Sequence, residues 1–402
     1  SVSAFLLNRS SDLDLTLAGD VKNEGLGSLI IQKNVTVDGK PVADTDDKTI
    51  ADGDYSFVVT NEAGETVGMA TITVKDGVSG TATVGNLPEG TYTVSETDSK
   101  GLVVDEASKQ VKVETGKTAT VATVAFTDNK PGTPGFEKKI KDTNDSTGET
   151  SVWQDSADYD LGDAVPYKLT ARLSNDVSSY RKYHVTFEDE MEESLDFQRD
   201  SVEVQLNGEK LDASKYTLTQ DGDHKFSVKL EWGDGQNKIG KEAGLDGATV
   251  DVYFTATLNA KAKVGNEGNI NRSRLLFSNN PNSFDDKDES EIPWDYVIAF
   301  TYKLDVNKVD QNAQALEGAE FTLEKLVKAT EEGAQDTYVP VALIVEKNVF
   351  TATGIDDGIY RLTETKAPAG YRTVAPMTFE VKVTHAPLKN DLNYDNRTEV
   401  LD

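Results

Sequence analysis

The sequence predicts an all-β protein built from immunoglobulin-like β-sandwiches. Apolar and polar residues alternate with a period of two in most apolar stretches, as in Thr71-Ile72-Thr73-Val74 and Phe379-Glu380-Val381-Lys382-Val383. This alternation is the pattern of a strand with one buried face. Turn dipeptides such as Asp38-Gly39 and Asn207-Gly208 separate the stretches, as is typical of sandwich folds. Only short stretches, such as Lys325 to Glu332, have a composition that could form helix.

The chain is long enough for several domains of ordinary size. Its 402 residues correspond to two to four domains at roughly 150 residues each. The segment Asn129-Lys130-Pro131-Gly132-Thr133-Pro134-Gly135 has the composition of a linker, and an acidic run from Asp285 to Pro293 marks a second break. We therefore expect three domains at 21–130, 134–297 and 298–402. Residues 1–20 are a leading segment, either a first strand or the end of a preceding module.

Charge and cysteine content exclude several classes of function. The formal net charge of -29 argues against binding to nucleic acid or to an anionic membrane, because both need a basic surface. The chain has no cysteine, so disulfides, thiol catalysis and cysteine metal sites are excluded. No apolar run is long enough to span a bilayer, and residues 1–10 lack the features of a signal peptide. Any export or anchoring segment would then lie outside this sequence.

Metal and cofactor sites are not expected. The three histidines, His184, His224 and His385, are far apart in the sequence and flanked by strand residues, which argues against a zinc or histidine-based catalytic site. The segment Asp142 to Glu149 is rich in oxygen-bearing side chains, but it lacks the glycine and glutamate positions of an EF-hand loop. We expect it to be a solvated, Asx-rich turn. We predict that the protein binds no cofactor.

Two phrases occur twice in the chain and indicate a repeated module. Gly90 to Thr97 and Gly358 to Thr365 both read Gly-x-Tyr-x-[Val/Leu]-[Ser/Thr]-Glu-Thr. About sixty residues before each lies a second shared phrase, Leu29 to Lys33 and Leu304 to Lys308. The first and third domains therefore look like copies of one module, separated by a larger and different domain.

The repeated phrases place a lysine and a glutamate on the core side of each copy. Residues two apart in a strand share a face, so Lys33 and Lys308 face the same way as the apolar residues before them, and so do Glu96 and Glu364. Burying such charges costs several kcal/mol. Burial also favours the neutral amine and the neutral acid, and a neutral amine can attack a nearby carboxamide to give an amide crosslink and ammonia. This reaction occurs once and consumes the lysine.

The same residues carry a resemblance to a known family. The run Tyr360-Arg361-Leu362-Thr363-Glu364-Thr365-Lys366-Ala367-Pro368-Ala369-Gly370-Tyr371 resembles the E-box of sortase-assembled Gram-positive pilins and of the Cna-B-type repeats of surface adhesins. Gly90 to Thr97 resembles a shortened E-box without the Ala-Pro-x-Gly-Tyr end. The resemblance implies a Cna-B-like first domain and a Cna-B-like third domain, each with an isopeptide bond from lysine to asparagine or aspartate. It assigns Lys33 and Lys308 as the lysines, with Glu96 and Glu364 as the catalytic acids.

The acceptors in these two domains are less defined. In the first domain the closing strand offers Asp128, favoured by its alternation with Val124 and Phe126, and Asn129, favoured by residue type. In the third domain Asn393 and Asn396 lie in what reads as a loop. We therefore expect the third acceptor beyond residue 402.

The middle domain resembles the Cna-A-like module of the same pilins. Phe136 to Ile140 is similar to its opening strand, where alternation turns Lys138 inward. Phe187-Glu188-Asp189 resembles the segment that supplies the acid, and Leu275 to Pro281 the strand that supplies the asparagine. The resemblance implies a triad of Lys138, Asp189 and Asn279.

The function implied by the resemblance is that of a structural pilus (fimbrial) subunit that is stabilised by self-formed isopeptide bonds and mediates surface adhesion. It would be extracellular, attached to the cell wall and without enzymatic turnover. Its partners would be other pilin subunits, joined by a sortase, and peptidoglycan. Neither the Tyr-Pro-Lys motif of backbone pilins nor an Leu-Pro-x-Thr-Gly sorting signal is present, and Lys130 occupies a place comparable to that of the linking lysine.

The sequence is also compatible with two other classes of function. A non-polymerised cell-wall adhesin would bind a host matrix protein or glycan, with Trp153, Trp232 and Trp294 as the aromatic residues to examine. A carboxylate-pair hydrolase would need two acids in an open cleft, and no sequence feature indicates one.

Overall fold

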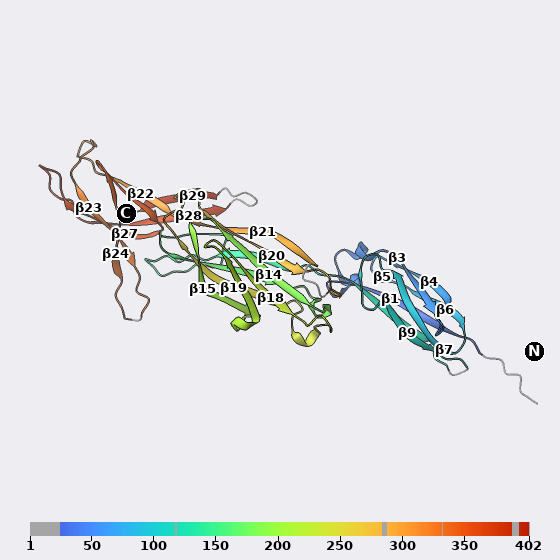
Figure 1. Ribbon diagram of the computed structural model, residues 1–402. Coiled ribbons are helices and arrows are strands. Elements are labelled where there is room, and N and C mark those ends of the chain that lie inside the picture. The colour runs from blue at the N-terminus through green and yellow to red at the C-terminus, as the bar shows by residue number, and fades with distance from the viewer. Residues whose placement is uncertain (1–24, 117–118, 284–287, 332, 388–393, 402) are drawn as a thin grey trace, which may run out of the picture. The chain divides into compact units, whose positions relative to one another are not determined.

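The computed structural model describes residues 25–116, 119–283, 288–331, 333–387 and 394–401 (Figure 1). Within these residues the helical segments are 3-10 turns of three or four residues, and all longer elements are strands. The all-β prediction is confirmed, whereas the helix considered for 325–332 is wrong, because its first residues continue the strand Glu320–Val327. None of the described helical segments has the length and apolar composition of a bilayer span. The turns are η1 (Val42–Asp44), η2 (Lys48–Ala51), η3 (Val177–Ser179), η4 (Ala213–Lys215) and η5 (Lys241–Ala243).

The chain divides into two compact units between Lys130 and Pro131, within the predicted linker. The first unit is a sandwich of two five-stranded sheets. One sheet has the order β2 (Lys40–Pro41), β1 (Gly27–Val37), β10 (Ala122–Lys130) and β8 (Val103–Val104), and β6 (Thr81–Leu87) also pairs with β1, along residues 27–32. The other sheet is β5 (Val78–Ser79), β4 (Thr66–Lys75), β3 (Gly53–Thr60), β7 (Gly90–Asp98) and β9 (Ser108–Val113).

The first and last described strands of the first domain are neighbours in the sheet and pair in parallel. β1 and β10 run in the same direction, with Lys33 opposite Phe126 and Val35 opposite Asp128. Alternate residues of both strands enter the core, where Leu29, Ile31 and Phe126 are fully buried. Lys33 and Asp128 continue these buried faces and therefore point inward.

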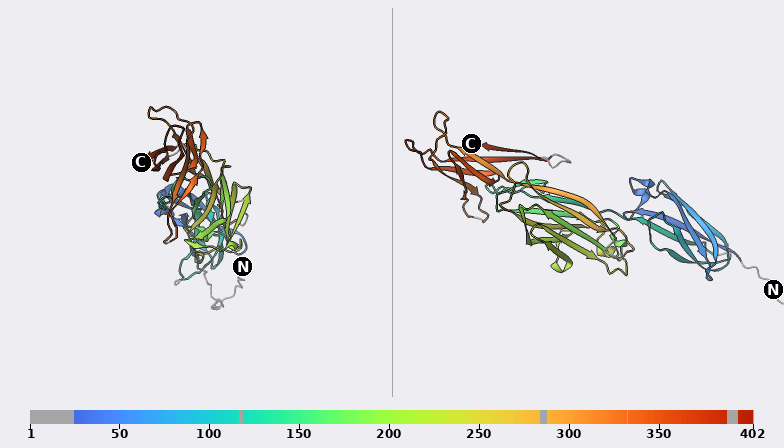
Figure 2. Two further views of the ribbon diagram at one scale, coloured as in Figure 1. Left: turned by 90° about the vertical axis from the view of Figure 1, so that its left-hand side faces the viewer. Right: turned by 45° about the horizontal axis from the view of Figure 1, so that its top comes forward.

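The second unit begins with the larger middle sandwich (Figure 2). One sheet has five strands, in the order β11 (Gly135–Ile140), β13 (Ala164–Arg172), β19 (Thr249–Leu258), β15 (Leu195–Leu206) and β16 (Glu209–Lys210). The other has six, in the order β12 (Ser156–Asp158), β21 (Glu289–Phe300), β20 (Asn269–Ser278), β14 (Tyr183–Met191), β18 (Lys225–Trp232) and β17 (Tyr216–Asp221). Buried aromatic residues from both sheets fill the space between them, among them Tyr167, Phe187 and Phe254.

The third sandwich consists of a three-stranded and a five-stranded sheet. The first has the order β22 (Tyr302–Asn307), β26 (Val349–Ile355) and β25 (Ile344–Glu346). The second has the order β24 (Thr337–Val341), β23 (Glu320–Val327), β27 (Gly358–Lys366), β28 (Met377–Pro387) and β29 (Tyr394–Leu401). Asn396, predicted in a loop, lies in β29 opposite His385, because residues 394–401 pair with β28 as a hairpin arm. Asn393 is outside the described residues, as is the leading segment 1–20.

The middle and third sandwiches share a strand. The predicted boundary between residues 297 and 298 falls inside β21, which runs to Phe300 and is followed by β22 after one residue. Along this strand Val297 and Ala299 belong to the middle core, while Ile298 and Phe300 belong to the third core. A strand presents alternate residues to opposite faces, so β21 closes both cores at once.

Candidate functional site

The first domain holds a lysine between two acids in its core. Lys33 Nζ lies 2.7 Å from Glu96 Oε1 and 2.5 Å from Asp128 Oδ2. The three side chains come from β1, β7 and β10, and each is at most 1% exposed. The ring of Tyr55 covers the ammonium group at 4.7 Å. The structure thus brings together the predicted lysine and acid of this domain and one of its two candidate acceptors.

Burial changes the acid–base properties of this site. It raises the pKa of Glu96 to about 7, although the adjacent Lys33 acts in the opposite direction. It also raises the pKa of Asp128, because a buried carboxylate loses its hydration. Near neutral pH one carboxyl group is therefore available as a proton donor beside the amine.

The other candidate acceptor, Asn129, points away from this site. Its Oδ1 accepts hydrogen bonds from Thr36 Oγ1 at 2.8 Å and from the Gly39 amide at 3.2 Å. Adjacent residues of a strand face opposite sides of the sheet, so Asp128 and Asn129 cannot both face Lys33. The geometry favours Asp128 as the acceptor.

The middle domain contains a second buried lysine. Lys138 on β11 is fully buried, and its Nζ lies 2.5 Å from Asp189 Oδ2 and 2.9 Å from Ser273 Oγ. The Ser273 hydroxyl donates in turn to Asp189. The rings of Tyr167 and Phe254 each lie 5.1 Å from the lysine nitrogen.

This environment favours the neutral forms of both groups. Burial lowers the pKa of Lys138, although Asp189 opposes the change, and burial raises the pKa of Asp189. An uncharged amine is a nucleophile and an uncharged carboxylic acid is a proton donor. The predicted pair Lys138 and Asp189 has the arrangement that crosslinking requires.

The third predicted member, Asn279, is not part of this site. It follows β20, where its side chain donates to Ser290 Oγ at 2.8 Å. It lies six residues beyond Ser273, the β20 residue that contacts Lys138, and six residues of strand span about 20 Å. Asn279 is therefore out of reach of Lys138, and its assignment is corrected.

Asn271 occupies the position expected of the acceptor. It is fully buried on β20, two residues from Ser273 and opposite Met191 of β14. Its amide lies close to Asp189 and lowers the pKa of that carboxyl, although burial remains the larger effect. Asn271 and Asn279 share the parity of the inward-facing residues, so alternation alone could not separate them. The cross-strand register of β14 and β20, which sets Ser273 opposite Asp189, separates them.

The third domain pairs its predicted lysine and acid at the end of β22. Lys308 Nζ lies 3.0 Å from Glu364 Oε1, with 13% of the lysine side chain exposed and none of the glutamate side chain. The other oxygen, Oε2, accepts from the Val374 amide at 2.7 Å. In the described residues β22 is an edge strand next to β26, whereas β1 has a parallel neighbour that supplies Asp128. The structure assembles this lysine–acid pair and leaves the prediction of its acceptor untested.

Lys130 and the tryptophans lie apart from the three lysine sites. Lys130 is the last residue of β10, and its side chain is exposed. Trp153 packs 5.9 Å from the Tyr253 ring, and Trp232 packs against the middle core. Trp294 lies in a surface groove of about 470 Å³ and is flanked by two guanidinium groups, those of Arg272 at 4.5 Å and Arg274 at 5.0 Å.

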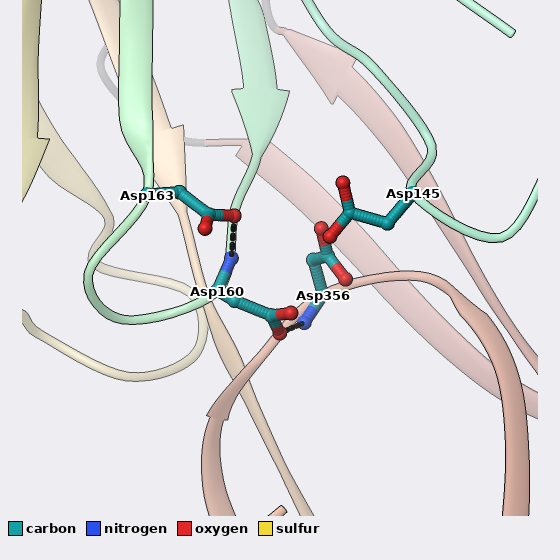
Figure 3. A group of neighbouring side chains, drawn as sticks. All are labelled: Asp145, Asp160, Asp163 and Asp356. Atoms are coloured by element: carbon teal, nitrogen blue, oxygen red, sulfur yellow. Dashed lines mark hydrogen bonds between the residues drawn. The ribbon is translucent and has the colours of Figure 1, made fainter. Parts of the chain in front are cut away.

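A fourth buried lysine, which sequence reasoning missed, joins the middle and third sandwiches. Lys325 of β23 is 2% exposed, and its ammonium group contacts Asp356 of its own domain. It also contacts Asp160 at 2.8 Å and Asp145 at 3.0 Å, both from loops of the middle domain. Figure 3 shows these aspartates converging with Asp163 at the junction.

The charge balance at Lys325 differs from that at Lys138. Burial acts to lower its pKa, but the carboxylates of Asp356 and Asp160 outweigh this and raise the pKa of Lys325 above its ordinary value. Lys325 therefore stays protonated and is a cation in an ion-pair network, not a nucleophile. Single carboxylate oxygens of Asp145, Asp160, Asp163 and Asp356 lie within 4.8 Å of one another, as metal ligands would. The ammonium group already supplies positive charge to three of them, and the absence of a metal site stays a prediction.

Hydrogen bonds across the same junction reinforce the network. The Asp356 amide donates to Asp160 Oδ1 at 2.9 Å, and the Asp357 amide to Asp158 Oδ2 at 2.9 Å. Ser146 is 4% exposed and donates to the Leu326 carbonyl at 2.7 Å. The segment from 142 to 149 forms the predicted Asx turn, in which Asn144 Oδ1 accepts from the amides of Ser146 and Thr147. Residues 147–149 are exposed as predicted, whereas Ser146 is covered by the third domain.

We predict that replacing Asp163 by asparagine stabilises the second unit at neutral pH. Burial, and then the charges of Asp160 and Asp145, raise the pKa of Asp163 to about 6, against about 3.9 in an unfolded chain. The native state therefore binds more protons than the unfolded state between these values, and the free energy of unfolding rises as the pH falls from 7 to 4. Asp163→Asn should raise the free energy of unfolding at pH 8 by about 1–2 kcal/mol, after allowance for solvent screening.

Urea unfolding at pH 8 and pH 4 measures this effect. The difference between Asp163→Asn and the wild type should disappear at pH 4, where Asp163 is protonated. The control Asp155→Asn removes a surface carboxylate that pairs with Lys139 and is 50% exposed, so it should give no gain. Equal effects of Asp163→Asn at both pH values would contradict the explanation.

Comparisons with known proteins agree with this architecture. The SpaA family model, described as a prealbumin-like fold domain, matches residues 36–130 and 302–398, which are the first and third sandwiches. The trypsin-resistant surface T6 protein of Streptococcus pyogenes serotype M6 is 27% identical over 68% of this chain and 50% of its own length. Fimbrial subunit type 2 of Actinomyces naeslundii is 25% identical over 88% of this chain and 79% of its own length. The chain thus spans half the length of the T6 protein.

A solved structure shows the same fold. BcpA, the major pilin subunit of Bacillus cereus, superposes with a TM-score of 0.51 over 89% of this chain and 95% of its own, at 19% identity. The chain is thus similar to Gram-positive pilus proteins, and its first and third sandwiches match the SpaA prealbumin-like domain.

Proposed function

We propose that the chain is a structural subunit of a Gram-positive pilus whose domains are closed by self-formed isopeptide bonds. The observation that carries this proposal is that Lys33 on β1 is buried between Glu96 on β7 and Asp128 on β10, so that lysine and acceptor lie on the first and last described strands of the sandwich. A second arrangement of this kind surrounds Lys138, and a lysine–glutamate pair recurs at Lys308. The bond forms once in each site, so the protein has no enzymatic turnover.

The reaction in the first domain joins an amine to a carboxyl group. Lys33 Nζ attacks the Asp128 carboxyl carbon, and Glu96 transfers a proton from the amine to the departing hydroxyl group. A C–N bond replaces a C–O bond, and water leaves. In the middle domain Lys138 and Asn271 give the same amide with release of ammonia, and Asp189 transfers the proton.

The placement of the first bond accounts for a mechanical role. The chain enters the first domain's sandwich through β1 and leaves it through β10, and these strands are parallel neighbours. A covalent bond between Lys33 and Asp128 carries tension directly from one to the other, so that the remaining strands are not pulled apart. Such a bond also restricts the unfolded chain as a disulfide does, without dependence on redox conditions.

Accurate intact mass tests the proposal. Each lysine–aspartate bond removes about 18 Da and each lysine–asparagine bond about 17 Da, a covalent change that composition alone does not include. We expect a deficit of about 35 Da for the first two sites together, with linked peptides containing Lys33 with Asp128 and Lys138 with Asn271. A mass equal to that of the sequence would leave the fold intact and reject the crosslinks.

We also propose that a sortase joins neighbouring subunits through Lys130, and that the polymer is attached to cell-wall peptidoglycan. The exposed side chain of Lys130 at the end of β10 is accessible to an enzyme, unlike the buried Lys33 and Lys138. Lys130→Arg keeps the charge but removes the primary amine, so it should abolish high-molecular-weight polymers while the intramolecular bonds still form. Immunoblots of cell-wall extracts measure this, with the exposed Lys112→Arg as the control. Normal polymers from Lys130→Arg would place the linkage elsewhere.

A further inference from the structure

The Lys138 site contains a hydroxyl group that its ion pair does not use. Tyr167 on β13 is fully buried, and the centre of its ring lies 5.1 Å from Lys138 Nζ. Among the described residues its hydroxyl has no hydrogen bond of good geometry, although it lies close enough to the Asn271 amide to interact with it. An unsatisfied buried hydroxyl reduces stability, so its presence at this position needs a reason.

The side-chain amide of Asn271 is likewise buried without a hydrogen bond of good geometry among the described residues. This holds for both its Oδ1 and its Nδ2. It lies near two groups, Asp189 on one strand and Tyr167 on another. The acceptor amide and the hydroxyl are therefore adjacent and both still able to form a hydrogen bond.

We propose that Tyr167 is a catalytic residue of the middle-domain crosslink, whose hydroxyl donates a hydrogen bond to Asn271 Oδ1 as negative charge develops there. This inference rests on the proposed crosslinking function and adds to it a group that stabilises the oxyanion. The three other groups then have separate tasks: Lys138 is the nucleophile, Asp189 transfers protons, and Ser273 holds both of them.

The reaction balances with these groups. Neutral Lys138 Nζ adds to Asn271 Cγ, which forms a C–N bond and places the electron pair of the C=O π bond on Oδ1, where Tyr167 donates. Protonated Asp189 gives its proton to Nδ2 and takes one from Nζ, so that it ends protonated as it began. The carbonyl then re-forms, the bond between Cγ and Nδ2 breaks, and ammonia leaves. Tyr167 ends as it began, with its proton and with a carbonyl acceptor beside it.

The surroundings make Tyr167 suitable for this task. Burial, with the nearby charge of Asp189, holds the pKa of Tyr167 well above its ordinary value, so the hydroxyl keeps its proton. The alternative donor, Ser273, already bonds to Lys138 and Asp189. The comparable ring in the first domain, Tyr55, donates to the Ala51 carbonyl at 2.8 Å and is not available to its own lysine site.

The test compares rates of bond formation in the full chain. Wild type, Tyr167→Phe and Tyr183→Phe are produced by timed cell-free synthesis, quenched and digested. The linked peptide of Lys138 with Asn271 is quantified by mass spectrometry against the unlinked peptides. Tyr183 is an equally buried tyrosine of the same core, six residues from Asp189 along β14 and therefore about 20 Å away. Near-UV circular dichroism verifies that each variant is folded, as expected when a single hydroxyl is removed.

Loss of one oxyanion donor slows acyl transfer about 100-fold or more, and Tyr167→Phe should slow the Lys138 bond by a comparable factor. The Lys33 bond of the same molecule should form at the wild-type rate, as should both bonds in Tyr183→Phe. A normal rate in Tyr167→Phe would overturn the role of the hydroxyl and leave the crosslink in place. If the wild type never forms the Lys138 bond while the Lys33 bond appears, both the middle-domain crosslink and this inference are rejected.

Discussion

Replacing Asn271 by alanine should lower the free energy of unfolding of the middle sandwich by about 5 kcal/mol, because the crosslink closes a loop of about 130 residues. The variant should also lack the mass deficit of about 17 Da that release of ammonia causes in the wild type. Lys138 and Asp189 remain paired in this variant, so the loss reflects the missing bond rather than an unpaired buried charge. Guanidinium unfolding and intact mass measure the two effects on the same sample.

The matched control is Asn279→Ala. Asn279 has the same residue type and strand parity, but its side chain bonds to Ser290 and lies outside the reach of Lys138. This variant should keep the mass deficit and lose only the contribution of a surface hydrogen bond, about 1 kcal/mol. A reversed result, with the bond lost in Asn279→Ala and kept in Asn271→Ala, would show that the register of β20 against β14 is not the one described.

The second large effect is expected in the first domain. Glu96→Gln leaves Lys33 and Asp128 in place but removes the acid that transfers the proton, so the bond should not form. The chain between the two residues is about 95 residues long, which corresponds to a loss of about 4.7 kcal/mol. For a domain of this size that loss lowers the melting temperature by about 20 °C or more.

Calorimetry and peptide mapping check the Glu96 prediction. The described residues up to Lys130 form a compact unit of their own, so the transition of this unit should shift while the transition of the second unit stays in place. Glu106→Gln, an exposed position in the same domain, is the control and should retain both the bond and the melting temperature. A fully linked Glu96→Gln protein would assign the proton transfer to another group.

Strand alternation was enough to predict most of the lysine sites. Lys33, Glu96 and Asp128 each continue a run of alternate apolar residues, and a period of two decides which side chains enter the core. The same rule favoured Asp128 over Asn129. It works because it depends only on the local conformation of one strand.

Alternation failed where the answer depends on how two strands are aligned. Asn271 and Asn279 are equivalent under a period of two, and only the register between β20 and β14 shows which of them is level with Asp189. Lys325 was missed for a related reason. Its partners Asp145 and Asp160 belong to loops of another sandwich, 180 and 165 positions away, and no local pattern connects them.

The strand that two cores have in common also determines how this part of the chain fails under load. β21 supplies Val297 to one core and Phe300 to the next, so neither sandwich can open without withdrawing apolar side chains from its neighbour. A covalent crosslink at Lys138 would therefore stabilise both sandwiches against mechanical unfolding. In the third sandwich the strand β22, which leads to Lys308, lies at a sheet edge among the described residues. Its core would nevertheless be stabilised against mechanical unfolding, because β21 connects it to the crosslinked middle sandwich.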